Sequence, residues 1–136
     1  MKYQEDLAAI SNCPPTNGVS KNTTAYRFVF NPVNSDSFIP PGKQNPARLQ
    51  QNNTQHKQCS LLALSMFKSC IDAENHFDLL KKKIPNIGKL IGEHLAEGNV
   101  MATDGIQTKP NSKGHFDFFE GVNADLPSQF KIIKQM

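Results

Sequence analysis

The stretch CSLLALSMFKSCIDAENHFDLLKKKI, residues 59–84, decides the fold, because an apolar run leads there directly into a capped helix. Ser69 and Asp72 have the spacing of a capping box, in which both side chains satisfy free amides of the first helical turn. Lysines suit the negative C-terminal end of that helix, and Pro85 stops it. We therefore predict a helix from about Ser69 to Ile84. Its apolar positions form one stripe: Cys70, Ala73, Phe77, Leu80 and Ile84.

The segments around this helix are typical of strands. The run at 59–67 fits either a helical or an alternating period, and we interpret it as a strand that ends near Met66. Residues 26–30 (YRFVF) are aromatic and β-branched, residues 115–120 (HFDFFE) are rich in Phe, and a final strand is expected at 130–133. Strands on both sides of a central helical region favour an α+β fold, with a small mixed or antiparallel sheet packed against one or two helices.

Alternation along the strand at 115–120 puts Phe116 and Phe118 on one face and Asp117 and Phe119 on the other. Three Phe in four positions is more apolar than a strand with one wet face requires. We therefore expect a helix, the N-terminal arm or a partner chain to cover Phe119.

The remaining segments are more polar. Residues 1–24 are expected to form an arm on the surface of a single domain that spans residues 25–136. Residues 40–57 are rich in Pro, Gln and Asn, and we predict a long mobile loop that serves as a partner-binding surface. Apolar residues at 86–96 fit a second helix that Gly98 ends.

Composition narrows the class of protein. The chain has 136 residues and a net charge of +3, with basic residues spread evenly apart from Lys81–Lys83, so a nucleic-acid partner is not expected. No apolar stretch is long enough to span a membrane, and residues 1–6 lack the apolar core of a signal peptide. We therefore expect a small soluble cytoplasmic protein. Three widely spaced Cys predict buried free thiols rather than a disulfide framework.

One set of residues resembles ADP-ribosyltransferases, whose fold commonly places an Arg on an early strand, a Ser at a strand end before a helix, and a Glu on a later strand. Arg27, Ser65 and Glu120 occupy such positions. The resemblance implies that Arg27 pairs with a phosphate of NAD or a related nucleotide. It also implies that Ser65 orients the nicotinamide side and that Glu120 stabilises the sugar cation as the glycosidic bond breaks.

Other residue sets suggest different chemistry. Cys59 with His115, oriented by Asp117 or Asn123, has the composition of a cysteine hydrolase. His56 and Cys59 have the spacing of half a zinc site, but no second closely spaced pair exists, so no metal is expected. The Lys-containing loops at 41–43 and 111–114 match no phosphate-binding spacing, and we expect ordinary turns there.

No complete catalytic set is present, so the leading hypothesis is a partner-binding or regulatory module without its own catalysis, and its expected partner is a protein. His115, Asp117 and Arg48 are its candidate binding residues. The first alternative is the ADP-ribosyltransferase-like domain with NAD as cofactor, and the second is the cysteine hydrolase. Whether the chain is an enzyme stays open at this point. Convergence of Arg27, Ser65 and Glu120 on one cleft would favour the first alternative, and positions on separate faces would exclude it.

Overall fold

The computed structural model describes residues 1–51 and 54–136, and its centre is a six-stranded antiparallel sheet in the order β4-β5-β2-β1-β3-β6. This sheet and its helices confirm the α+β prediction. The strands are β1 (Thr23–Val29), β2 (Leu64–Phe67), β3 (His94–Val100), β4 (Gly105–Gln107), β5 (His115–Glu120) and β6 (Phe130–Gln135).

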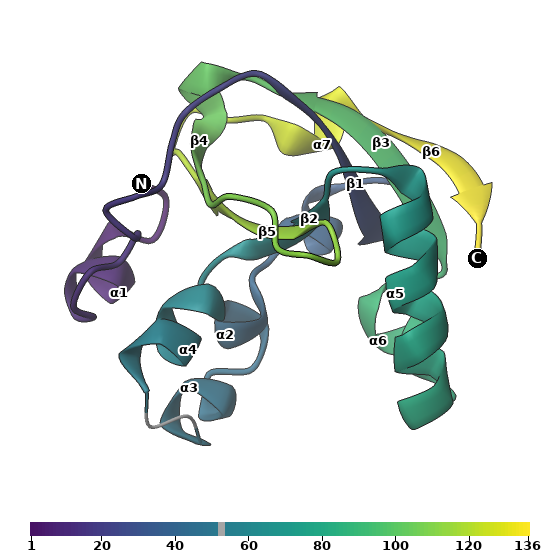
Figure 1. The fold of residues 1–136 in the computed structure, drawn as a ribbon, viewed down its shortest axis with the longest axis horizontal. Coiled ribbons are helices and arrows are strands. Elements are labelled where there is room, and N and C mark those ends of the chain that lie inside the picture. The colour runs from purple at the N-terminus through teal and green to yellow at the C-terminus, as the bar shows by residue number, and fades with distance from the viewer. Residues whose placement is uncertain (52–53) are drawn as a thin grey trace.

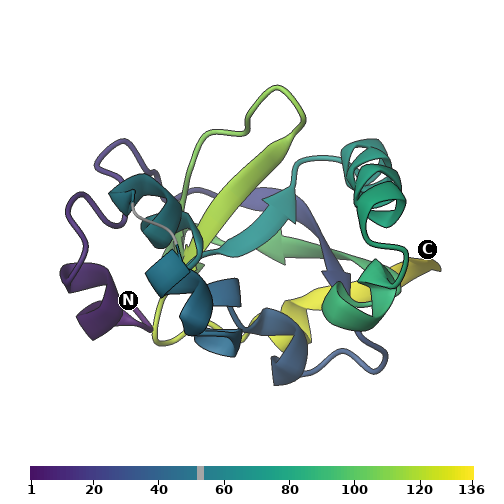
Figure 2. The ribbon, with the colours of Figure 1, turned by 90° about the horizontal axis from the view of Figure 1, so that it is seen from below.

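Short helices surround the sheet. The α-helices are α1 (Gln4–Ala8), α2 (Pro41–Gln44), α3 (Ala47–Gln51), α4 (Gln55–Ser60), α5 (Cys70–Lys83), α6 (Ile87–Ile91) and α7 (Leu126–Gln129), and the 3-10 turns are η1 (Ser35–Phe38) and η2 (Ala102–Asp104). In both views α5 and α6 lie at one end of the molecule, and α1 and α4 lie at the other (Figures 1 and 2). None of the described helices has the length and apolar character needed to cross a membrane.

Helix α5 is confirmed close to its predicted bounds. The Ser69 side chain accepts a hydrogen bond from the Asp72 amide at 3.1 Å, as predicted, whereas the Asp72 carboxylate accepts from the Ser69 hydroxyl at 2.7 Å instead of from a backbone amide. Ala73 and Phe77 are buried against the sheet. Ile84 was predicted to be buried but is exposed, because the helix ends at Lys83 and the backbone of Ile84 is already extended.

The prediction of a second helix over 86–96 is wrong in its second half. Helix α6 ends at Ile91, and Gly92 turns the chain with a φ of 102°, where a side chain would collide with the carbonyl of Val29. Residues His94–Val100 then pair along the whole of β1. This sheet pairing outweighs the helical spacing of the apolar residues.

The region between β1 and β2 also differs from the prediction. Residues 40–57 were expected to be a loop but contain three short helices, and α4 is capped by Thr54 and continues to Ser60. Strand β2 is therefore only the last part of the run at 59–67, although it ends close to Met66 as expected. The expected mobility of the region stays a prediction, and residues 52–53 lie outside the described part of the chain.

Phe119 is covered as predicted. It is buried in a cluster with Leu7 of the N-terminal arm and with Cys59 and Leu62, which come from α4 and the turn after it. The opposite face of β5 contributes Phe116 and Phe118 to the main core. The strand is thus covered on both faces.

The N-terminal arm is attached by a disulfide between Cys13 and Cys59. Free thiols were predicted, and for these two residues the prediction is wrong because the arm packs beside α4 and brings their Cα atoms to 5.7 Å. Cys70 is the free thiol that accounts for the odd count. The arm also bonds to the sheet, since the amide of Lys2 donates to the carbonyl of Glu120.

Candidate functional site

The candidate site lies where strands β1 and β2 diverge. In the described part of the chain their register consists of one pair, Tyr26 opposite Phe67, whereas β1 and β3 pair over seven positions. The Arg27 side chain makes hydrogen bonds in the gap: Nη1 donates to the carbonyl of Ser65 at 2.7 Å, and Nε donates to the carbonyl of Ser37 at 2.9 Å. The guanidinium therefore supplies a donor to a β2 carbonyl that the sheet leaves without a β1 partner.

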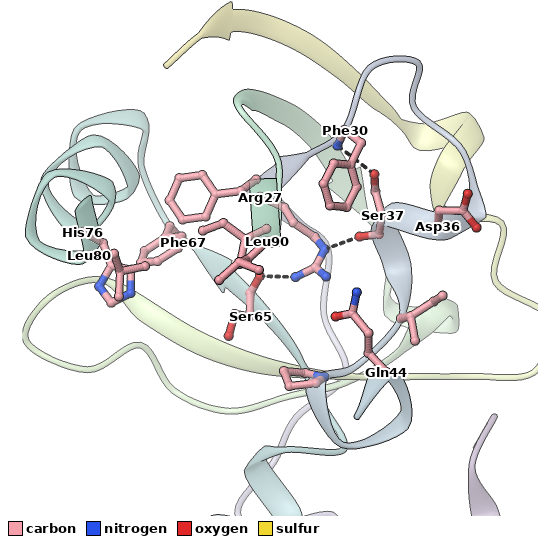
Figure 3. Close-up of a pocket in the computed structure, with 14 residues that line it drawn as sticks. Arg27, Phe30, Asp36, Ser37, Gln44, Ser65, Phe67, His76, Leu80 and Leu90 are labelled. Atoms are coloured by element: carbon pink, nitrogen blue, oxygen red, sulfur yellow. Dashed lines mark hydrogen bonds between the residues drawn. The ribbon is translucent and has the colours of Figure 1, made fainter. Parts of the chain in front are cut away.

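A cavity of about 140 Å³ opens beside this guanidinium. Figure 3 shows Arg27 between Ser37 and Ser65, with Gln44 facing it. The apolar walls come from β1, β2 and the two helices α5 and α6, and they include Phe28, Phe67, Leu80, Leu90 and Ile91. The cavity thus combines one cation and several hydrogen-bonding groups with aromatic and aliphatic walls.

Arg27 is held as a cation in this setting. Burial lowers the pKa of its guanidinium to about 10, and the negative charge of Glu120 opposes that shift. The group therefore stays charged at neutral pH. The other three N–H donors, one on Nη1 and two on Nη2, make no hydrogen bond to any residue that the structure describes and are available to a ligand.

Ser65 has a second polar neighbour on the adjacent strand. Its Oγ lies 3.0 Å from Nε2 of His115, whose ring stacks on His76 of α5 with centroids 6.3 Å apart. Burial lowers the pKa of His115, and the nearby Asp117 carboxylate opposes that shift. Burial and the neighbouring His115 also lower the pKa of His76. Both imidazoles are therefore neutral at pH 7.

Asp117 and His115 also line a second, more polar cavity of about 610 Å³, next to α4 and the N-terminal arm. Asp117 accepts a hydrogen bond from the Ser60 side chain, and burial nevertheless raises the pKa of its carboxyl. Arg48 lies on α3, exposed to solvent, and lines neither of these two cavities. The three candidate binding residues are thus divided: two are adjacent on β5, and the third is elsewhere.

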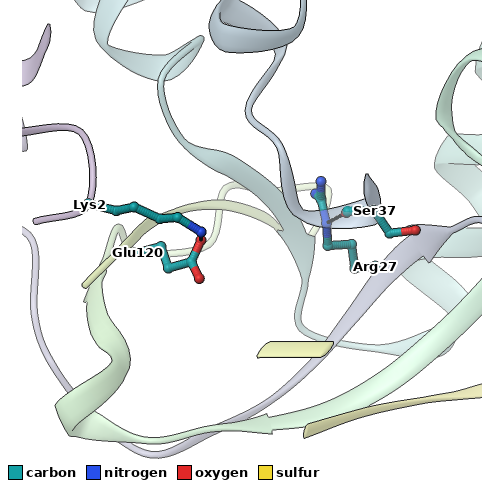
Figure 4. Close-up of polar contacts among 4 residues, drawn as sticks. All are labelled: Lys2, Arg27, Ser37 and Glu120. Carbon is teal, nitrogen blue, oxygen red and sulfur yellow. Dashed lines mark hydrogen bonds and ion pairs between the residues drawn. The ribbon is translucent and has the colours of Figure 1, made fainter. Parts of the chain in front are cut away.

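Glu120 lies apart from Arg27 and Ser65. Its carboxylate is buried at the end of β5 and pairs with Nζ of Lys2 at 3.4 Å (Figure 4). Burial raises the pKa of this carboxyl, while the charges of Lys2 and Arg27 lower it. Glu120 does not line the cavity that contains the other two residues. The structure therefore brings together two of the three residues of the ADP-ribosyltransferase resemblance.

The residues of the hydrolase hypothesis are arranged differently from the prediction. The sulfur of Cys59 is bonded to Cys13 and is no free thiolate, and Nε2 of His115 points to Ser65 instead. Within residues 1–51 and 54–136, no three metal-ligating side chains gather at one point. The segment at 41–43 is part of α2, whereas Asn111 and Gly114 form a turn.

Sequence reasoning missed two contributors to the site. The carbonyl of Ser37 holds Arg27, but a backbone acceptor leaves no signal in the sequence. His76 directly precedes the core residue Phe77, so the helical stripe places it at the edge of the buried face. That position could have indicated a side chain that is half-buried beside the sheet.

Comparison with models of protein families, with curated proteins and with solved structures found no match for this chain.

Proposed function

We propose that the cavity beside Arg27 binds NAD or a related nucleotide and that the chain is an ADP-ribosyltransferase-like domain. The observation that carries the proposal is that Arg27 and Ser65, on different strands and far apart in the sequence, line the same cavity and are joined by a hydrogen bond. A phosphate and an aromatic base need a cation and flat apolar walls, and both are present beside these residues.

The hydrogen bonds of Arg27 refine how it would hold a phosphate. The Nε–H and one N–H of Nη1 are already donated to carbonyls. The second N–H of Nη1 and both N–H groups of Nη2 remain for a phosphate, so the end of the guanidinium makes the contact.

The size of the cavity limits what it can enclose. Cavities that enclose whole drug-sized ligands measure roughly 300–1,000 Å³. At about 140 Å³ this one suits one end of a dinucleotide, with the other end outside. We assign the enclosed end to the nicotinamide ribose, because Ser65 and the aromatic walls lie there.

Glu120 receives a different role in this proposal. Its carboxylate pairs with Lys2 and does not line the cavity, so it acts on Arg27 through its charge, which favours the guanidinium cation. Stabilisation of a sugar cation would require Glu120 to leave Lys2.

The test is titration calorimetry with NAD on the wild-type chain, on Arg27→Lys and on the matched control Arg48→Lys. Lys keeps the charge of Arg27, but its three donors sit on one nitrogen and cannot reproduce the planar fork with which the guanidinium reaches both carbonyls and the cavity. We expect the affinity to fall at least about tenfold in Arg27→Lys and to stay unchanged in Arg48→Lys. Circular dichroism establishes that each variant is folded. Absence of NAD binding by the wild type, or equal binding by folded Arg27→Lys, contradicts the proposal.

The second candidate is a partner-binding module without catalysis. Helices α5 and α6 expose large apolar side chains, including Ile71 at 65%, Leu79 at 46% and Leu90 at 51%. Such side chains are the ones that a protein partner would cover. Affinity capture from the native host with the wild type and with Leu79→Glu tests this candidate: a specific partner should be lost from the variant, and capture of the same proteins by both argues against it.

We retain a cytoplasmic location as a proposal, and the disulfide offers its test. Disulfides are rare in the reducing cytosol, so Cys13 and Cys59 should be thiols there. Rapid alkylation in intact cells followed by mass spectrometry distinguishes the two states. An intact disulfide in cells would point to an oxidising compartment instead.

A further inference from the structure

Ser65 differs from an ordinary strand serine in its partner. Its Oγ lies 3.0 Å from Nε2 of His115, the distance over which a hydroxyl can pass its proton to an imidazole. Ser65 is partly exposed and lines the cavity of Arg27, while His115, to which its Oγ is directed, lines the second cavity. A nucleophile and its base are thus present on adjacent strands.

His115 is fixed on several sides. Its ring contacts Phe67 edge-on at 5.4 Å and stacks on His76, and its backbone amide donates to the Asn111 side chain at 3.0 Å. The ionisable groups around it are His76 and Asp72 of α5, Lys113 of the preceding turn, Asp117 of its own strand, and His56 and Lys109 across the second cavity. Burial favours the neutral ring, which is the form that can accept a proton.

We propose that Ser65 is a nucleophile activated by His115 and that it accepts the ADP-ribosyl group of a dinucleotide bound in the cavity. The inference rests on the proposed function, because it requires NAD or a related nucleotide in the Arg27 cavity. It goes beyond that function by naming a residue of this chain as a site of covalent modification. The transfer requires the C1′ carbon of the enclosed nicotinamide ribose to lie beside Oγ of Ser65.

The step balances without a further reactant. The Ser65 hydroxyl gives its proton to Nε2 of His115 as Oγ forms a bond to C1′ of the ribose. The bond between C1′ and the nicotinamide nitrogen breaks, and its electron pair returns to the ring, so nicotinamide leaves as a neutral molecule. The proton on His115 passes to solvent, and the product is an O-glycoside in which Oγ of Ser65 is bonded to C1′ of the ADP-ribosyl group.

Two reagents test separately whether Ser65 is nucleophilic and whether it accepts the ADP-ribosyl group. The first is a fluorophosphonate, which reacts with an activated serine by forming a P–O bond and releasing fluoride, and which needs no nucleotide site. The second is NAD, followed by intact mass and peptide mapping. Both are applied to the wild type, to Ser65→Ala, to His115→Gln and to Ser60→Ala, a neighbouring serine whose partner is Asp117 rather than a histidine. Thermal melts establish that the variants are folded.

We expect both reagents to label Ser65 in the wild type and in Ser60→Ala. Position 65 should carry no label in Ser65→Ala, and in His115→Gln the labelling of Ser65 should be at least about tenfold slower. The labelling rate should rise with pH as His115 loses its proton. Fluorophosphonate labelling without an NAD adduct, in a chain that binds NAD, overturns the transfer step alone. Absence of both labels overturns the nucleophile, and absence of NAD binding overturns the proposed function together with the transfer step.

Discussion

Phe77→Ala tests the packing that positions one wall of the cavity. The Phe77 side chain is 4% exposed, and its ring lies 5.3 Å from that of Phe28, which lines the cavity. A buried Phe removes about 150–250 Å² from water, which at about 25 cal/mol/Å² is worth about 4–6 kcal/mol. The Ala side chain keeps part of that buried area, while the cavity that the substitution leaves adds a destabilising term. We therefore expect the free energy of unfolding to fall by about 3–5 kcal/mol.

The assay is urea denaturation of the wild type, of Phe77→Ala and of Leu79→Ala. Leu79 lies on the same helix and is 46% exposed, so its loss should be below about 1 kcal/mol and controls for the change in helix propensity. An unchanged m value would show that the midpoint shift reports stability. A loss below about 1 kcal/mol for Phe77→Ala would refute the assignment of this side chain to the core.

Three further predictions follow from the site and the arm. Replacing both disulfide cysteines, as Cys13→Ser with Cys59→Ser, should lower the free energy of unfolding in a chemical melt by up to about 4 kcal/mol, because the disulfide closes a loop with a sequence separation of 46. A decrease under about 1 kcal/mol would contradict this. The folded-state pKa of Glu120 is raised, so its carboxyl stabilises the fold at low pH, and that contribution is lost as the pH rises through the folded pKa. The stability of Glu120→Gln relative to the wild type should therefore increase as the pH rises above the unfolded value of about 4.3, and a relative decrease in melts at a series of pH values would contradict this. The folded-state pKa of His115 is lowered, so its contribution is present above the unfolded value of about 6.5 and falls away below it; His115→Gln should show a weaker acid destabilisation than the wild type over that window.

The sequence predicted the elements whose stabilising contacts lie between residues close together in the chain. Helix α5 could be predicted because its cap and its stripe lie within a few residues of each other. Helix α6 and β3 could not be separated, because Leu95 has helical spacing from Ile91 and only the pairing with β1 makes it a strand residue. The disulfide depends on the same kind of long-range packing, since nothing near Cys13 indicates α4 as its neighbour.

Part of the candidate site could be anticipated from the sequence, and the part that depends on contacts between strands could not. Arg27 and Ser65 were recognised because each stands at a strand position that the family resemblance names. The approach of His115 to Ser65 depends on the register between β2 and β5, where Ser65 lies opposite Asp117 and Phe67 opposite His115. A one-residue shift would turn His115 to the other face of the sheet, so no local pattern could reveal that contact.

The divergence of β1 and β2 links the stability of the fold to the choice of ligand. A continuous sheet would leave no cavity, and without Arg27 the gap would orphan the carbonyls of Ser37 and Ser65 at about 1–3 kcal/mol each when shielded from water. A ligand that drew the guanidinium away would bring back that cost. Under the proposed function, the favoured ligand is therefore one whose phosphate meets the remaining N–H donors at the end of the guanidinium and leaves both carbonyl bonds in place.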